Sequence, residues 1–127
     1  MYPTDRRYTK EHEWIIAEGD SGTMGLTDYA QDQLGDIVYL EMPEQGAEFA
    51  KGDVMGSVES VKAVSEIYAP IGLKVVEING DLENEPEKVN AEPHEGGWIC
   101  KIEITNAAEL DELMDAAAYQ AFIESES

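Results

Sequence analysis

The feature that most constrains this fold is a succession of short β-forming runs, each closed by a residue that interrupts a strand. The run "DIVYLEM" ends at Pro43, and "LKVVEIN" begins just after Pro70 and Gly72. No long helical patterns alternate with these runs, so a doubly wound parallel sheet is not expected. The pattern predicts a mainly β fold, an antiparallel sandwich or barrel with helical additions.

Alternation along two of these runs predicts which side chains face the core. "WICKIEIT" at 98–105 places Cys100 and Ile102 on one face and Lys101 on the other. "DIVYLEMP" at 36–43 places Ile37 and Tyr39 together, opposite Val38, Leu40 and Met42. One face of each strand is therefore expected to be buried.

Helical segments are predicted at two places. Thr27 is the expected N-cap and Gly35 the expected stop of a short helix in "TDYAQDQLG". Apolar residues at helical spacing follow Asn106 in "AAELDELMDAAAYQAFIE", with Asn106 as an expected N-cap. Asp115 is the candidate N-cap of a second C-terminal helix.

The length and the N-terminal composition bear on domain organisation. A chain of 127 residues suits one domain, so residues 1–127 are expected to form a single unit. Residues 1–7 are polar and are expected to be loose. The N-terminus has no apolar signal region, and no apolar run reaches the roughly 18 residues of a membrane span, which favours a cytoplasmic, bacterial protein. A processed mitochondrial matrix form stays open.

The charge balance narrows the class of partner. The chain carries 28 acidic and 8 basic residues, a formal net charge of −20. Nucleic-acid phosphates and anionic membrane surfaces would repel such a chain. The balance favours partner proteins that dock through basic faces.

Few residues could support catalysis or metal binding. His12, His94 and the single cysteine, Cys100, show no metal-ligand spacing, and no phosphate-binding or nucleophile motif occurs. Cys100 lies on the apolar face of its strand, where a packed thiol is the default. The sequence therefore indicates no metal site and no catalytic residue.

Lys62 is the strongest candidate for a functional residue, because it lies between two β-rich runs where its side chain is expected to project into solvent. In "VESVKAVSEIYAP" the residues beside it are small or branched, and Glu59 lies three positions upstream. A turn lysine is the plain interpretation, but a lysine projecting from a β-bend also suits covalent modification. Its amine is protonated at neutral pH and so needs a separate enzyme that supplies an activated acyl group.

Seven segments resemble the glycine cleavage system H protein family, in order and over nearly the whole chain. These are "YTKEHEW" at 8–14, "GLTDYAQDQLGDIVYLEMPE" at 25–44, "VESVKAVSEIYAP" at 58–70, "VVEIN" at 75–79, "VNAEP" at 89–93, "GGWICKI" at 96–102 and "ELDELMDAAAY" at 109–119. The resemblance implies a lipoyl-domain-like, antiparallel barrel-sandwich hybrid with short helices, including C-terminal helices. It implies a carrier that is not an enzyme.

The resemblance also implies the site and the partners. Lys62 would bear lipoate in amide linkage, with Glu59, Ser60, Val61 and Ala63 recognised by a lipoate ligase or a lipoyl/octanoyl transferase. Glu13 would lie in a cleft that receives the loaded arm. The carrier would take an aminomethyl group from pyridoxal-phosphate-dependent glycine decarboxylase to a tetrahydrofolate-dependent aminomethyltransferase, and electrons to the flavoenzyme dihydrolipoyl dehydrogenase.

One position departs from the family pattern. A Ser-Gly pair is expected two residues after Pro70, but Gly72 comes one place early and Leu73 stands at the glycine position. Leucine tolerates positive φ poorly. Either the turn shifts by one residue or the backbone there differs, and lipoylation is expected to survive because Glu59 and the hairpin are intact.

Rival interpretations are distinguished by the residues around Lys62. A biotinyl carrier should place Met on both sides of the lysine, and a 2-oxoacid dehydrogenase lipoyl domain normally has Asp before it; this chain has Val61 and Ala63. An H-like relay of octanoyl or lipoyl groups stays open. An enzyme acting through Cys100 or the carboxylates also stays open, with no turnover expected from the unmodified chain.

Overall fold

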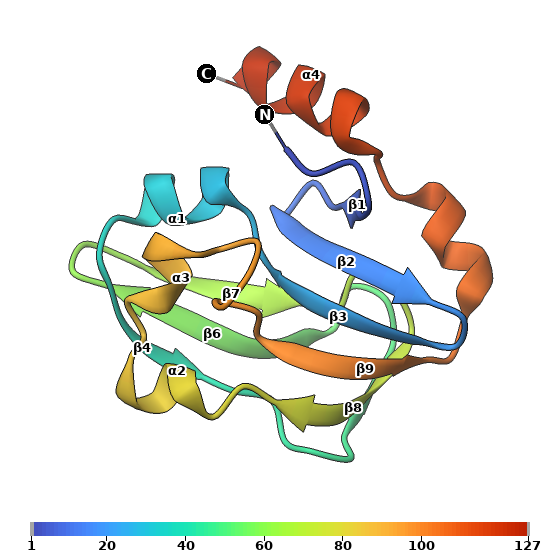
Figure 1. Ribbon diagram of the computed structural model, residues 1–127, viewed down its shortest axis with the longest axis horizontal. Coiled ribbons are helices and arrows are strands. Elements are labelled where there is room, and N and C mark those ends of the chain that lie inside the picture. Colours follow the sequence, from blue (N-terminus) through green and yellow to red (C-terminus); the bar gives the residue numbers. More distant parts are fainter. Residues whose placement is uncertain (1, 127) are drawn as a thin grey trace.

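The computed structural model describes residues 2–126, which form two antiparallel sheets with short helices around them (Figure 1). The six-stranded sheet has the order β1-β2-β3-β9-β8-β5, and the three-stranded sheet has the order β4-β6-β7. The strands are β1 Arg7–Tyr8, β2 Glu13–Glu18, β3 Ser21–Leu26, β4 Ile37–Glu41, β5 Glu48–Phe49, β6 Val54–Ser60, β7 Val64–Tyr68, β8 Leu73–Ile78 and β9 Cys100–Ile104. The helices are α1 Asp28–Leu34, α2 Asp81–Asn84, α3 Lys88–Ala91, the 3₁₀ helix η1 Ala107–Glu112 and α4 Ala116–Glu126.

This arrangement confirms the mainly β, antiparallel fold with C-terminal helices. Strand β9 shows the predicted alternation, because Cys100, Ile102 and Ile104 are buried while Lys101 and Glu103 are exposed. Ile99, which the alternation places on the same face as Lys101, is nevertheless fully buried just before the strand begins. Apolar side chains from both sheets form one core cluster, including Ile15, Met24, Val58, Ile67, Val75 and Ile102.

Strand β4 corrects the predicted alternation. Its register against β6 shifts between Ile37 and Tyr39, so Val38 has no partner there. Such a bulge rotates the residues that follow it. Val38 and Tyr39 are both exposed, while Ile37 and Leu40 are both buried. The predicted pairing of Ile37 with Tyr39 on one face is therefore wrong.

The predicted helix caps have mixed outcomes. Thr27 caps α1, because its hydroxyl accepts a hydrogen bond from the Ala30 N–H at 3.2 Å. Asp115 caps α4, because its carboxylate accepts from the Ala118 N–H at 2.8 Å. Asn106 occupies the predicted N-cap position, but its side chain makes no capping bond and the helix after it is a 3₁₀ helix.

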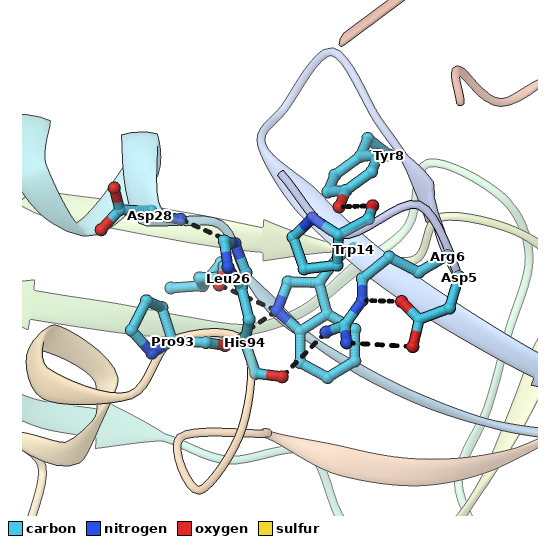
Figure 2. A network of polar contacts seen from close by, with 9 residues as sticks. Asp5, Arg6, Tyr8, Trp14, Leu26, Asp28, Pro93 and His94 are labelled. Atoms are coloured by element: carbon cyan, nitrogen blue, oxygen red, sulfur yellow. Dashed lines mark hydrogen bonds and ion pairs between the residues drawn. The ribbon is translucent and has the colours of Figure 1, made fainter. Parts of the chain in front are cut away.

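Within residues 2–7, the segment expected to be loose, the Arg6 side chain is buried while Thr4, Asp5 and Arg7 are exposed; residue 1 lies outside the described residues. The guanidinium of Arg6 lies 4.6 Å from the Trp14 ring centre and donates to the His94 carbonyl oxygen at 2.8 Å (Figure 2). The Trp14 indole N–H lies 2.9 Å from the carbonyl oxygens of both Leu26 and Pro93.

The two ends of the described chain meet at one side of the molecule. Tyr8 stacks on Tyr119 of α4 with ring centres 4.8 Å apart, and Tyr2 meets Tyr119 edge-on. Figure 1 shows α4 and the N-terminal segment together, away from the β6–β7 turn at the left edge. No helix within residues 2–126 has the length and apolar character needed to span a membrane.

Candidate functional site

Lys62 lies at the tip of the β6–β7 hairpin. The two strands pair antiparallel, with Glu59 opposite Val64 as the last pair before the turn. Ser60 closes the turn: its N–H donates to the Ala63 carbonyl at 2.8 Å, and its hydroxyl oxygen accepts from the N–H groups of Lys62 and Ala63. The side chain of Ser60 is thus used inside the turn, which holds the lysine in a defined place.

The tip is open to solvent and to an approaching protein. Lys62 is exposed, and Val61 and Val64 beside it expose 69% and 66% of their surface. The ion pairs among residues 2–126 involve Arg6, His12, Lys51 and Lys88 as cations, so no carboxylate in that part of the chain neutralises the Lys62 ammonium. The amine is therefore accessible to an enzyme that supplies an activated acyl group.

Glu59 faces outward on the same side of the three-stranded sheet as two large side chains. It pairs with Tyr39 of β4 and with Val64 of β7, and all three residues are exposed. Paired residues in an antiparallel sheet project to the same side. An enzyme that approaches Lys62 along this face would meet one carboxylate between two apolar side chains.

Glu13 is buried, not a surface glutamate. It begins β2 with 1% of its surface exposed. One carboxylate oxygen accepts from the Thr9 hydroxyl at 2.8 Å, and the other accepts from the Tyr68 N–H at 3.0 Å. Burial raises the pKa of Glu13 to about 7, although these two hydrogen bonds act in the opposite direction.

A cleft of about 630 Å³ lies beside Glu13. Its walls come from the β1–β2 connection, from the end of β7 at Tyr68, from the turn at Lys51 and Gly52, and from residues 112–114. At the rim, the Lys51 ammonium pairs with the Glu112 carboxylate at 2.7 Å. The structure thus offers an acidic group inside a groove, which suits a ligand that ends in a cation.

The cysteine and the two histidines lie in environments that stabilise the fold. Cys100 is buried, and burial raises the pKa of its thiol to about 12, which leaves it unreactive at neutral pH. His12 meets the Tyr119 hydroxyl through Nδ1, and Nε2 of His94 accepts from the Asp28 N–H at the start of α1. Residues 2–126 contain no group of three or more His, Cys, Asp and Glu side chains arranged to hold a metal ion.

The departure at Leu73 is explained by the backbone. Leu73 lies in β8, paired with Phe49 and Ile104, and is fully buried. Within residues 2–126 the positive-φ residue other than glycine is His12, so Leu73 is not strained. Gly72 is required for space, because a Cβ there would lie 2.9 Å from the Thr105 hydroxyl oxygen. The structure therefore accommodates leucine at this position without a positive φ.

A protein-family model described as "Glycine cleavage H-protein" matches residues 6–126. The chain belongs to the glycine cleavage H-protein family. The family is the lipoyl carrier of the glycine cleavage system, and its members carry covalently attached lipoate. It is a carrier and not an enzyme, and its partners are the other components of that system.

Relatives and a solved structure agree with this assignment. The glycine cleavage system H protein of Acidobacterium capsulatum is 54% identical over 126 residues, covering 99% of this chain and 97% of the relative. That of Symbiobacterium thermophilum is 55% identical over 120 residues, covering 94% of each. The crystal structure of the Mycobacterium marinum H protein is 35% identical, with a TM-score of 0.89 over 97% of this chain and 99% of that one.

Two residues that hold the Glu13 carboxylate could not be predicted from the sequence. Thr9 and Tyr68 hold the Glu13 carboxylate, the first through its hydroxyl and the second through its backbone N–H. The four-residue spacing of Thr9 and Glu13 in "YTKEHEW" is a weak local signal of such a bond. Tyr68 gives none, because a backbone donor 55 residues away depends on the fold and not on its side chain.

Proposed function

We propose that Lys62 is the residue that carries the lipoyl group, within a single carrier domain. The observation that supports this most is the exposed ammonium at the tip of a closed hairpin, which forms no ion pair with a carboxylate of residues 2–126. An amide bond would form between Nζ and the acyl carbon of an activated donor, and the donor's leaving group would depart as the nitrogen loses its protons. The modification removes one positive charge and leaves the hairpin bonds of Ser60 unchanged.

The lipoyl group on Lys62 would form a flexible arm that enters the active sites of the partner enzymes. When bound, lipoate supplies a disulfide that can take up an aminomethyl carbon on one sulfur and two electrons on the other, and later return both. The chain contributes a rigid anchor, which keeps the group at high effective concentration near each docked enzyme. We propose glycine decarboxylase, an aminomethyltransferase and dihydrolipoyl dehydrogenase as the individual enzymes that dock on this carrier.

Attachment itself requires a further partner, a lipoate ligase or a lipoyl/octanoyl transferase. The exposed positions Glu59, Val61 and Ala63 are proposed as its contacts, and Ser60 as the residue that shapes the turn for it. The net charge of −20 suits partners with basic docking faces. The bacterial sources of the relatives named above support a cytoplasmic location.

We propose that Glu13 binds the loaded end of the arm. Its two oxygens each accept one hydrogen bond, from Thr9 and from Tyr68, and retain further acceptor capacity. An ammonium entering the cleft would draw the Glu13 proton away, because a nearby positive charge favours the carboxylate. The charge pair would then form in a partly enclosed groove, where it is less screened than at the surface.

Mass spectrometry of the chain after incubation with a lipoate ligase, lipoate and ATP tests the attachment site. We expect the intact mass to increase by one lipoyl group and peptide mapping to locate it on Lys62. A known H protein treated in parallel is the positive control. An unmodified chain beside a modified control, or a lipoyl group on another lysine, contradicts the proposal.

Thermal unfolding of the loaded carrier tests the role of Glu13. Loading the arm with an aminomethyl group should raise the Tm of the wild-type chain, because a bound ligand stabilises the folded state. Glu13→Gln should lose most of this increase, since the amide has no negative charge. The matched control is Glu11→Gln, which changes an exposed carboxylate lining the same cleft. Equal Tm increases in the two variants would show that Glu13 does not bind the arm.

A further inference from the structure

Asn90 of α3 connects two elements that lie apart in the sequence. Its side-chain NH₂ donates to Gln31 Oε1 and to the Gly35 carbonyl oxygen, both at 2.9 Å. Its side-chain oxygen accepts from the Ile37 N–H at 2.8 Å. The single amide thus spans the connector between α1 and β4, fixing the residue before Asp36 and the residue after it.

The connector needs this support because its backbone has an unusual shape. Gly35 has φ +82° and ψ −158°, a combination that residues with a Cβ rarely adopt. Glycine also has the greatest backbone freedom in the absence of other contacts. Two hydrogen bonds to the flanking backbone groups select one shape from the many that Gly35 permits.

The connector in turn lies under the hairpin tip. The Asp36 carbonyl oxygen accepts from the Val61 N–H at 3.0 Å. A Cβ built on Gly35 would lie 3.4 Å from Cε of Lys62, so the lysine stem passes directly over the glycine. Figure 1 shows α1 and α3 close together at the end of the molecule where the β6–β7 turn projects.

We propose that Asn90 is a positioning residue for Lys62, holding the α1–β4 connector as the floor on which the lysine hairpin rests. The proposal rests on the proposed function of Lys62 only for its enzymatic readout. Asn90 does not touch the modifying enzyme. It acts through Gly35 and Asp36, so that the amine is presented in one orientation, and small misplacements of a reacting group can reduce a rate about 100-fold.

The chain supplies a matched control in Asn79. That amide also donates two hydrogen bonds, in its case both to backbone carbonyl oxygens, those of Gly96 and Trp98, and accepts one from a backbone N–H, that of Asp81. None of these partners belongs to the hairpin or to its floor. Asn79→Ala therefore removes a similar set of bonds and reports the effect of lost stability alone.

The experiment compares Asn90→Ala with Asn79→Ala by three measurements. We expect the ligase kcat/KM for Asn90→Ala to fall about 10-fold, and that for Asn79→Ala to stay within about twofold of wild type. Hydrogen exchange at the Val61 amide, normalised to amides of β9, should rise about 10-fold in Asn90→Ala only. Acylation of Lys62 by a small activated ester should be equal in all three proteins, because the amine stays exposed.

Asn90→Asp provides a second variant of the same shape in case the alanine variant does not fold. It keeps the acceptor for the Ile37 N–H and loses both donors. We therefore expect the same decrease in the ligase kcat/KM and the same increase in hydrogen exchange at the Val61 amide. Wild-type ligase kinetics and Val61 exchange in either folded Asn90 variant would overturn the inference. If the wild-type chain is not lipoylated, the proposed function fails, and Val61 exchange still decides whether Asn90 holds the hairpin.

Discussion

Lys62→Arg is expected to leave the chain folded and to abolish its activity as a carrier. The side chain is exposed and its substitution lies outside the core, so the free energy of unfolding should change by less than about 0.5 kcal/mol. Arginine remains protonated under all ordinary conditions and cannot serve as the acceptor amine. Glycine cleavage, measured with the other components of the system, should fall to the level seen without this chain.

Lys74→Arg is the control for this substitution. Lys74 is an exposed residue of β8, away from the hairpin, and the same change there should leave both the lipoyl mass increase and glycine cleavage intact. If Lys62→Arg still gains the lipoyl mass or still supports turnover, another residue is the attachment site and the interpretation of the hairpin is wrong.

Glu13→Gln is expected to change how the stability of the chain depends on pH. The folded-state pKa of Glu13 is raised to about 7 from an ordinary value of 4.5. Below pH 4.5 both states of the wild type hold this proton. As the pH rises toward 7 the unfolded state loses the proton first, so the folded wild type becomes less stable relative to it. Above pH 7 this effect lowers the free energy of unfolding of the wild type by its full amount, about 3 kcal/mol.

Glutamine cannot ionise, so the variant lacks this dependence. Urea unfolding between pH 4 and 8 should show Glu13→Gln gaining about 3 kcal/mol on the wild type across that window. The other carboxylates titrate in both proteins and cancel in the difference. Glu11→Gln, which changes an exposed carboxylate nearby and keeps Glu13 buried, should retain most of the pH dependence of the wild type. Curves for Glu13→Gln that run parallel to the wild type would show that burial does not perturb this carboxyl group.

Local sequence signals predicted the elements whose structure depends on neighbouring residues. Alternation gave the buried face of β9, and Asp115 and Thr27 cap the helices that follow them. The location of Lys62 between two strands followed from β-rich runs on both sides of it. In each case the deciding interactions join residues within one element or across one turn.

Contacts between distant segments account for what the sequence did not predict. The bulge at Val38 depends on how β4 pairs with β6, and the packing of Arg6 depends on Trp14 and on the His94 carbonyl. Family resemblance pointed to Glu13, but its burial comes from the meeting of β2 with the end of β7. The sequence carries no signal for the role of Asn90, because its three hydrogen-bond partners are brought together only by the fold.

The anchor and the proposed receptor of the arm belong to different sheets, Lys62 to the hairpin of the three-stranded sheet and Glu13 to the six-stranded one. Tyr68, at the end of β7, lies six residues beyond Lys62, so even a fully extended chain would place the two at most about 20 Å apart. The position of Glu13 beside Tyr68 is maintained by interior side chains, such as Ile15 and Ile67, that pack between the two layers. A core substitution that let one sheet shift over the other would change the distance between Lys62 and Glu13, although both residues would remain in place in the sequence.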